Sequence, residues 1–259
     1  MGEEIKNIGI IEVTADNIEK EHIGCAIGNT GDAKLCSDAK KAWMRQNFEA
    51  GYHFWRLDAR GKALIEATPA QHAWAPVQAD NWLFIDCFWV SGQFKGHGVA
   101  RRLLEKATTH AKAEGMHGLV AVASVKKRAF LSEQGFYAHL GFEKVDGAAP
   151  DFVLMALPFD KKAPLPRFID NADKLPRQDG IFIWYSSHCP HAVKYVDILR
   201  KTAAEKGVPF TSVQLQSAQQ AREVPCPFTT WVMFHDGKFV TNEIFSPGKL
   251  QKYLETIGK

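Results

Sequence analysis

The sequence predicts a mixed α/β (α+β) protein in which strands and helices alternate along most of the chain. Short apolar runs rich in aromatic and β-branched residues, such as "WLFIDCFWV" at residues 82–90, are typical of buried strands. Between such runs, apolar residues recur at helical spacing, as at Val99, Leu103 and Ala107. These two patterns favour an arrangement in which local hairpins come first and crossover helices follow.

The first 160 residues contain most of the expected elements. In order, these are a strand near residues 8–14, helical segments at 17–27 and 37–50, a hairpin about Arg60-Gly61, the strand at 82–90, a helix beginning near Val99, a strand at 118–124, a helix at 128–139 and two strands between 142 and 159. Because hairpins join the early strands and helices join the later ones, we expect one mixed central sheet.

A polar stretch with four prolines between residues 158 and 176 follows, and it favours neither a helix nor a central strand. The charge balance also changes there. Residues 1–160 contain 18 Lys and Arg against 20 Asp and Glu, a net charge of −2, whereas residues 161–259 contain 14 against 9, a net charge of +5. We therefore predict a first domain at 1–160, a linker at 161–179 and a second domain at 180–259.

The second domain is expected to be a small β-α-β-β-β-α unit. Strands are predicted at residues 180–186 and 209–215 and in a hairpin about Asp236-Gly237, which is a strong turn pair. One helix is predicted at 191–207, and a last one begins after the N-cap residue Ser246.

Composition and charge exclude several classes of protein. The chain is 46% hydrophobic and 24% charged, as in ordinary globular proteins, and its formal net charge is only +3. It has neither the clustered basic face of a nucleic-acid-binding protein nor an apolar run near the ~20 residues of a membrane span. Five cysteines without dense spacing indicate neither a disulfide framework nor a metal site. Since the N-terminus also lacks a secretory pattern, we expect a cytoplasmic protein that binds neither nucleic acid nor membrane.

Residues 90–104, "VSGQFKGHGVARRLL", join a strand to a helix through a turn with two glycines. Such a turn can leave successive backbone N–H groups free at a helix N-terminus, where the helix dipole also favours an anion. The turn lacks the GK[ST] end of a phosphate-binding NTPase loop and the GxGxxG spacing of a dinucleotide site. Another kind of anion site is therefore indicated.

The segment "QFKGHG" matches the Q/R-x-x-G-x-G/A element of the GNAT superfamily, the acyl-CoA-dependent N-acyltransferases. Further on, "FYAHLGFEKV" resembles a second GNAT element, in which a helix ends in Tyr-x-x-x-Gly-Phe and a strand follows. The chain resembles this superfamily over roughly residues 5–158. One departure is "RAFLS", which stands where relatives often carry Asn early in the second motif helix.

The resemblance implies a GNAT fold that binds acetyl-CoA as a substrate. Backbone amides of the turn would hold the pyrophosphate, and the end of the preceding strand would pair with the pantetheine arm, while the side chains of Phe88 and Trp89 pack in the protein. A Cβ at Gly96 or Gly98 would obstruct the phosphate. The residues expected to contact coenzyme A are Phe88, Trp89, Val90, Gln93, Phe94, Lys95, Gly96, His97, Gly98, Val99, Ala100 and Arg101.

Acetyl transfer to an amine requires a base for the amine and an acid for the leaving thiolate. Tyr137 occupies the position where many GNAT relatives keep the Tyr that protonates the sulfur of coenzyme A. Asp86 is one candidate base, because a carboxylate inside an apolar strand needs a purpose or a partner. Strand alternation would place it on the same face as Phe88 and Val90. Glu66 is the alternative base.

The stretch "IFIWYSSHCPHA" resembles the thioredoxin superfamily, in which a Cys begins the helix after a strand. A helix N-terminus lowers a thiol pKa, so Cys189 could be reactive. The resolving position holds Ala192, which leaves Cys226 as an unusual second thiol if it lies near Cys189. By the same resemblance, Pro227 is the expected cis-proline facing Cys189, and Pro225 is the second choice.

A GNAT domain followed by such a unit looks like the YoaP-type acetyltransferases. The resemblance implies an acetyl-CoA-dependent N-acetyltransferase in which an amine of a small molecule or peptide attacks the thioester directly. Two alternatives stay open at this point. One is a monothiol protein centred on Cys189 with a regulatory or vestigial coenzyme A site, and the other is a binding module without turnover.

Overall fold

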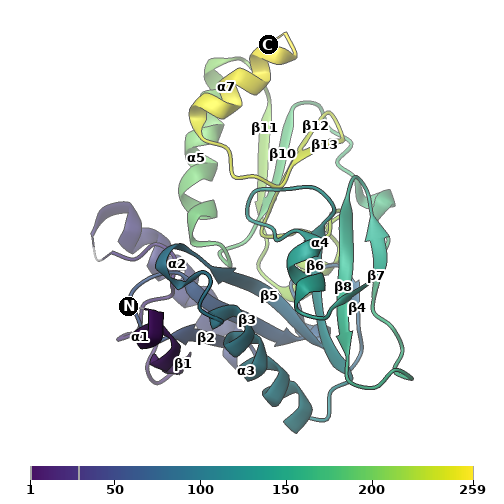
Figure 1. Cartoon of the computed structure of the whole chain (residues 1–259). Helices are drawn as coiled ribbons and strands as arrows, with labels where there is room; N and C mark the ends of the chain where they lie inside the picture. Colours follow the sequence, from purple (N-terminus) through teal and green to yellow (C-terminus); the bar gives the residue numbers. More distant parts are fainter. Residues whose placement is uncertain (1, 29, 259) are drawn as a thin grey trace.

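The computed structural model of the protein describes residues 2–28 and 30–258. A seven-stranded mixed sheet with the order β1-β2-β3-β5-β6-β8-β7 forms the larger part (Figure 1). Its strands are β1 (Ile10–Val13), β2 (His53–Leu57), β3 (Ala63–Pro69), β5 (Leu83–Val90), β6 (Gly118–Ser124), β7 (Glu143–Ala148) and β8 (Phe152–Pro158). The mixed central sheet predicted from the sequence is therefore present.

The sheet opens between its two central strands. All its pairs are antiparallel except β5 and β6, which run parallel and pair only from Leu83 to Ile85 on β5 and from Leu119 to Ala121 on β6. Beyond Ile85, β5 continues to Val90 without a ladder partner on the β6 side among the described residues. Figure 1 shows the β1–β5 half turning away from the β6–β8–β7 half.

Helices cover this sheet and connect its strands. The longest two are α2 (Gly31–Phe48) and α3 (Val99–Ala113), and shorter ones are α1 (Gly2–Asn7), α4 (Gln134–His139) and the 3₁₀ turns η1 (Ala70–His72) and η2 (Gly92–Phe94). The predicted stripe of α3 is buried, since Val99, Leu103 and Ala107 are each at most 1% exposed. They pack in one apolar cluster with Ile65 and Ile85 of the sheet.

Two helix predictions in this part are wrong. Residues 17–27 form turns rather than a helix, because Gly24 and Ala26 have positive φ angles of 71° and 50°. The helix predicted at 128–139 begins only at Gln134, since Phe130 has a φ of 61°. In the other direction, α2 begins at Gly31, six residues before the predicted Ser37.

The predicted linker contains regular structure. β9 (Arg167–Phe168) pairs with β4 (Val77–Gln78), and a 3₁₀ turn, η3 (Ala172–Lys174), follows. The linker is also held to the larger part by hydrogen bonds, because Trp82 Nε1 donates to Pro164 O at 3.1 Å and Phe168 N donates to the Asp146 carboxylate at 2.7 Å.

The C-terminal segment, residues 180–258, contains a second sheet with the order β11-β10-β12-β13. Its elements are β10 (Ile181–Tyr185), α5 (Pro190–Glu205), β11 (Phe210–Gln214), α6 (Ala218–Arg222), β12 (Trp231–His235), β13 (Lys238–Thr241) and α7 (Pro247–Thr256). β10 and β11 are parallel, and the other pairs are antiparallel. The hairpin turn at Asp236 and Gly237 and the N-cap Ser246, which accepts a hydrogen bond from Lys249 N, are where the sequence predicts them. α6 is an addition to the predicted order.

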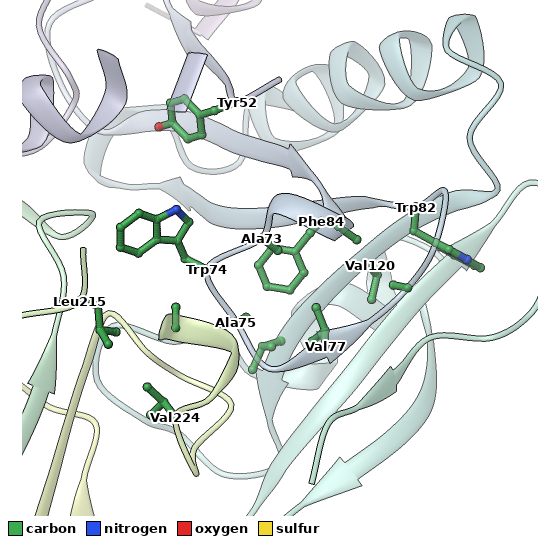
Figure 2. Packing of buried hydrophobic residues seen from close by; sticks show 14 of the residues in the cluster. Tyr52, Ala73, Trp74, Ala75, Val77, Trp82, Phe84, Val120, Leu215 and Val224 are labelled. Carbon is green, nitrogen blue, oxygen red and sulfur yellow. The ribbon is translucent and has the colours of Figure 1, made fainter. Parts of the chain in front are cut away.

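The C-terminal segment shares a hydrophobic core with the larger part. Figure 2 shows Trp74 and Ala75 between the larger sheet and the stretch that carries Leu215 and Val224. Thr229 donates a hydrogen bond to the backbone oxygen of Trp74 as well. Because apolar burial is continuous across this contact, the two parts fix the position of one another.

Candidate functional site

The glycine turn after β5 has the conformation that its sequence predicts. Gly96 and Gly98 have φ angles of 79° and 74°, and a Cβ at either would meet no atom within 4 Å, so the backbone there is open to solvent. In the described chain, no acceptor is found for the N–H groups from Gly96 to Arg101, which lead into α3. These amides and the N-terminus of α3 therefore present donors to an anion.

Side chains around the turn differ in what they can contact. Phe94 is buried beneath Gly61, and Phe88 packs in the core against Phe136, although Phe88 also lines the smaller cavity beside β5. Gln93 and Lys95 are exposed. The remaining predicted contacts, Val90, His97, Val99, Ala100 and Arg101, lie along the end of β5 and the start of α3.

Trp89 does not pack as predicted. Its side chain is 41% exposed and lines two adjoining cavities beside β5. It therefore belongs to the wall of the candidate site and not to the core.

Asp86 lies at an irregularity of β5. Glu66 pairs with Cys87 and Ala67 pairs with Ile85, which leaves Asp86 as the extra residue of a β-bulge. The predicted alternation that put Asp86 on the face of Phe88 is therefore wrong, because the bulge changes the face between residues 85 and 88. The half-buried Asp86 carboxylate instead lines both cavities beside β5.

The Asp86 carboxylate is suited to exchange a proton near neutral pH. Burial raises its pKa to about 7, although the hydroxyl of Thr68 donates a hydrogen bond to it at 2.6 Å and favours its charged form. The negative charge of Glu66 raises the pKa further.

Glu66 lies in a buried hydrogen-bond network that keeps its carboxylate ionised, whereas the pKa of Asp86 is about 7. Lys40 Nζ, the Tyr52 hydroxyl and His188 Nε2 all donate to Glu66 Oε2, at 2.5, 2.6 and 2.8 Å. Burial alone would raise the pKa of Glu66, but Lys40 and His188 outweigh it and hold that pKa at about 2. Glu66 thus remains ionised, and its Oε2 already accepts three hydrogen bonds, which makes it a poor proton acceptor.

Tyr137 lies on α4 and lines the smaller cavity together with Asp86. Its side chain is 3% exposed, and no hydrogen bond of its hydroxyl is found in the described part of the chain. Burial raises its pKa well above the usual value, so the phenol carries its proton at any physiological pH. It is a potential donor beside the opening between β5 and β6.

The surroundings of Cys189 and Cys226 do not favour the predicted thiol chemistry. Burial raises the pKa of Cys189 to about 11, against the lowering expected for this residue at a helix N-terminus. Burial also raises the pKa of Cys226, to about 12. Cys226 lines a different cavity from Cys189 and packs in a different apolar cluster. The cis-proline prediction is also wrong, because the only cis peptide bond among the described residues joins Ala149 and Pro150. Neither Pro225 nor Pro227 has the expected bond.

The larger of the two cavities beside β5, about 290 Å³, is formed by both parts of the chain. Asp86, Cys87 and Trp89 of β5 line one side, and His188 and Cys189 of the C-terminal segment line another. Sequence reasoning missed His188, Lys40, Phe130 and Phe228 as members of this site. For His188, its place beside Cys189 in "SSHCPH" was the one available signal.

Comparison with known proteins decides the family. Residues 18–142 match the Acetyltransferase (GNAT) family, and residues 209–252 match a family described as YoaP-like. The uncharacterized N-acetyltransferase YoaP of Bacillus subtilis (strain 168) is 43% identical over 249 residues, which cover 95% of this chain and 98% of that protein. The chain belongs to the YoaP family of GNAT N-acetyltransferases. In this YoaP-family enzyme, the amide-rich turn and Asp86 both lie within the GNAT match.

Solved structures of GNAT proteins resemble part of this YoaP-family chain at low identity. A GNAT acetyltransferase of Staphylococcus aureus Mu50 is 19% identical with a TM-score of 0.41, covering 59% of this chain and 99% of its own. The putative acetyltransferase YncA of Salmonella typhimurium, solved with acetyl-CoA, is 17% identical with a TM-score of 0.41, covering 61% of this chain and 96% of its own.

Neither a metal centre nor a membrane span is found in the described structure. Residues 2–28 and 30–258 contain no cluster of three or more His, Cys, Asp or Glu arranged for a metal ion. None of the helices in these ranges is long and apolar enough to cross a bilayer.

Proposed function

We propose that this N-acetyltransferase transfers the acetyl group of acetyl-CoA to an amine that attacks the thioester directly, with Asp86 as the base. The observation that carries the proposal is the position of Asp86, a carboxylate with a pKa of about 7 at the point where β5 separates from β6. A general base works best when its pKa lies near the operating pH.

The coenzyme would occupy the opening of the sheet. Its pyrophosphate binds the free amides from Gly96 to Arg101, and Lys95 and Arg101, both exposed, add positive charge. The unpaired edge of β5 from Asp86 to Val90 provides backbone groups for the amides of the pantetheine arm. This path leads the thioester from the turn towards Asp86 and Tyr137.

The chemistry then needs three proton transfers. Asp86 accepts a proton from the ammonium group of the acceptor, directly or through water, and the neutral amine attacks the acetyl carbonyl. As the C–S bond breaks, Tyr137 donates its proton to the departing sulfur of coenzyme A, and its raised pKa keeps that proton available. The newly acylated nitrogen returns its extra proton to the Tyr137 phenolate, and Asp86 releases its proton to solvent. Glu66 is not the base in this scheme, because its carboxylate already accepts three hydrogen bonds and its pKa is about 2.

We propose further that residues 180–259 form a thioredoxin-like second domain joined to the first (1–160) by the linker at 161–179. The parallel pair β10 and β11 joined through α5, followed by the antiparallel hairpin β12-β13 and α7, supports this assignment. With Cys189 protonated at neutral pH, its role would be to line the acceptor cavity rather than to exchange thiols.

Two measurements test the function. The first is calorimetric titration with acetyl-CoA of the wild-type protein and of the double variant Gly96→Glu, Gly98→Glu. Saturable one-site binding is expected for the wild type and not for the double variant. The second is thiol release from acetyl-CoA with a panel of amines, comparing Asp86→Asn with the exposed control Asp80→Asn and with Cys189→Ser.

We expect Asp86→Asn to lower kcat/KM by about 10²–10⁴-fold and to abolish the rise of activity as the pH passes 7. Asp80→Asn and Cys189→Ser should retain acetyl transfer and the rise of activity as the pH passes 7. Absence of acetyl-CoA binding by the intact protein would overturn the proposal, and full activity of Asp86→Asn would overturn the assignment of the base.

A further inference from the structure

The larger cavity beside Asp86 is walled by aromatic side chains from three separate parts of the chain. Trp89 comes from β5, Phe130 from the loop between β6 and α4, and Phe228 from the segment before β12. Trp89 and Phe130 are 41% and 46% exposed, and both line the same two cavities beside β5. Neighbouring exposed aromatic groups of this kind mark a surface that binds an apolar partner.

The backbone at Phe130 supports a functional reason for its position. Its φ of 61° lies in the left-handed region, which costs free energy for a bulky residue. Such strain clusters at binding sites, where the surrounding structure holds a side chain in place for a ligand. Phe130 also lines the smaller cavity with Tyr137, so it stands at the junction of the two cavities.

Charges around the larger cavity largely neutralise each other. Lys40 and Glu66 form a buried ion pair, and Glu243 pairs with Lys249. Burial, aided by Lys40, lowers the pKa of His188, and burial likewise lowers that of His191, so both rings are neutral near pH 7. Asp86 is thus the one unpaired carboxylate among the described lining residues. Lys62 at the exposed rim has no ion-pair partner in the described chain, and it would repel a ligand with several positive charges.

We propose that the acceptor of this enzyme is a small primary amine with an apolar, aromatic body and no second cationic group. The amine reaches Asp86, while the ring is held among Trp89, Phe130 and Phe228. The volume of about 290 Å³ is roughly twice the ~150 Å³ of an apolar cavity that admits benzene, so a ring and a short amine-bearing chain fit. Polyamines and aminoglycosides are disfavoured, because the wall offers neither several free carboxylates nor many unpaired polar groups.

This inference rests on the proposed function, and a comparison of acceptors separates the two. Thiol release from saturating acetyl-CoA is measured with 2-phenylethylamine, ethylamine, spermidine and a lysine-containing peptide. Ethylamine keeps the amine and removes the ring. We expect kcat/KM for 2-phenylethylamine to exceed that for ethylamine by at least about 10²-fold, since one methylene in a good pocket already contributes 10–200-fold and a ring buries more apolar surface. It should also exceed kcat/KM for spermidine and for the peptide.

Two variants locate the selectivity. Phe130→Ala and Phe228→Ala should each lower the ratio of kcat/KM between 2-phenylethylamine and ethylamine about tenfold, mainly through KM for the aromatic amine. Leu165→Ala removes an apolar side chain that is 59% exposed and lines neither cavity beside β5, so it should leave the ratio unchanged. Because Phe130 is itself half-exposed, its truncation should not prevent folding.

The outcomes separate cleanly. Equal or better use of ethylamine, spermidine or the peptide overturns the aromatic-amine inference and leaves acetyl transfer standing. An unchanged ratio in both Phe variants also overturns it. Failure of every amine to release coenzyme A overturns the proposed function, and the inference with it.

Discussion

His188 Nε2 donates a hydrogen bond to Glu66 Oε2 at 2.8 Å, across 122 residues of sequence, from the turn after β10 to strand β3 of the larger sheet. Burial and Lys40 lower the pKa of His188, so the ring is neutral, and its Nδ1 then accepts from the Thr230 hydroxyl at 3.3 Å. The ring also packs against Trp43, with centroids 4.7 Å apart. Through this contact the C-terminal segment completes the wall of the candidate site.

Removing this ring should weaken the contact between the two parts. In His188→Ala, Glu66 loses one of three buried donors and Trp43 loses a packing partner, so we expect the free energy of unfolding to fall by about 1–3 kcal/mol. His188→Gln retains a donor and should lose less. Urea unfolding is the measurement, with the exposed His72→Ala as the control. Equal stability of His188→Ala and His72→Ala would contradict the structural role.

The same carboxylate predicts how acid affects stability. The folded-state pKa of Glu66, about 2, lies below its ordinary value of 4.5, so its contribution is present above pH 4.5 and is lost as the pH falls towards 2. The size is about 3 kcal/mol. The contribution of Asp86 to folding stability depends on pH in the opposite sense. Because its pKa is raised, this contribution is present below about pH 4 and is lost as the pH rises through 7.

The Glu66 contribution is isolated by comparison with a variant. Glu66→Gln leaves Lys40 buried without its anion, so it should be less stable at pH 7 by about 3–5 kcal/mol. Its deficit should shrink between pH 4.5 and 2.5, because in this range Glu66 takes up a proton in the unfolded wild type but stays ionised in the folded one, which lowers the stability of the wild type. The exposed Glu143→Gln is the control, and its difference from the wild type should stay constant. A deficit that does not change with pH would show that Glu66 is not ionised in the folded protein.

The sequence predicted the local parts of the site better than the distant ones. The turn with Gly96 and Gly98 was predictable, because it depends on a short motif whose backbone conformation its own residues determine. The helix carrying Tyr137 was predicted with the correct end, but its start was placed six residues too early. The bulge at Asp86 was not, since it arises from pairing with β3 and inverts the expected face. The contact of Glu66 with His188 depends on packing between two sheets, which no local pattern encodes.

The secondary-structure predictions were likewise correct where a local sequence pattern determines the backbone, and wrong elsewhere. Strand runs such as residues 118–124 were predicted with the bounds of β6, because residues 119–123 form a short, continuous apolar run. The residues around Gly24 and Phe130 resembled helix by spacing, but positive φ angles interrupt both stretches. In the C-terminal segment, the strong turn pair at Asp236-Gly237 fixed the hairpin, whereas the extra helix α6 had no such signal.

Tyr137 offers a separation of activity from stability. Its hydroxyl makes no hydrogen bond in the described structure, so Tyr137→Phe should change the free energy of unfolding by less than about 1 kcal/mol. As the proposed acid, it should still lower kcat by about 10²-fold or more while KM for acetyl-CoA stays near the wild-type value. Steady-state kinetics and urea unfolding test this, with Tyr195→Phe on α5 as the control. Unchanged kcat would show that another group protonates the sulfur.

The glycine turn allows the sharpest matched pair, because α3 is flanked at both ends by a glycine of the same conformation. Gly98 precedes the helix with a φ of 74°, Gly115 follows it with a φ of 65°, and a Cβ would meet no atom within 4 Å at either position. Gly98→Ala and Gly115→Ala should therefore cost similar stability, about 1 kcal/mol. Only Gly98→Ala places a methyl group where the pyrophosphate is proposed to bind, so calorimetry should show at least about tenfold weaker acetyl-CoA binding for it alone. Equal affinities in the two variants would mean that the free amides after Gly96 do not hold the coenzyme.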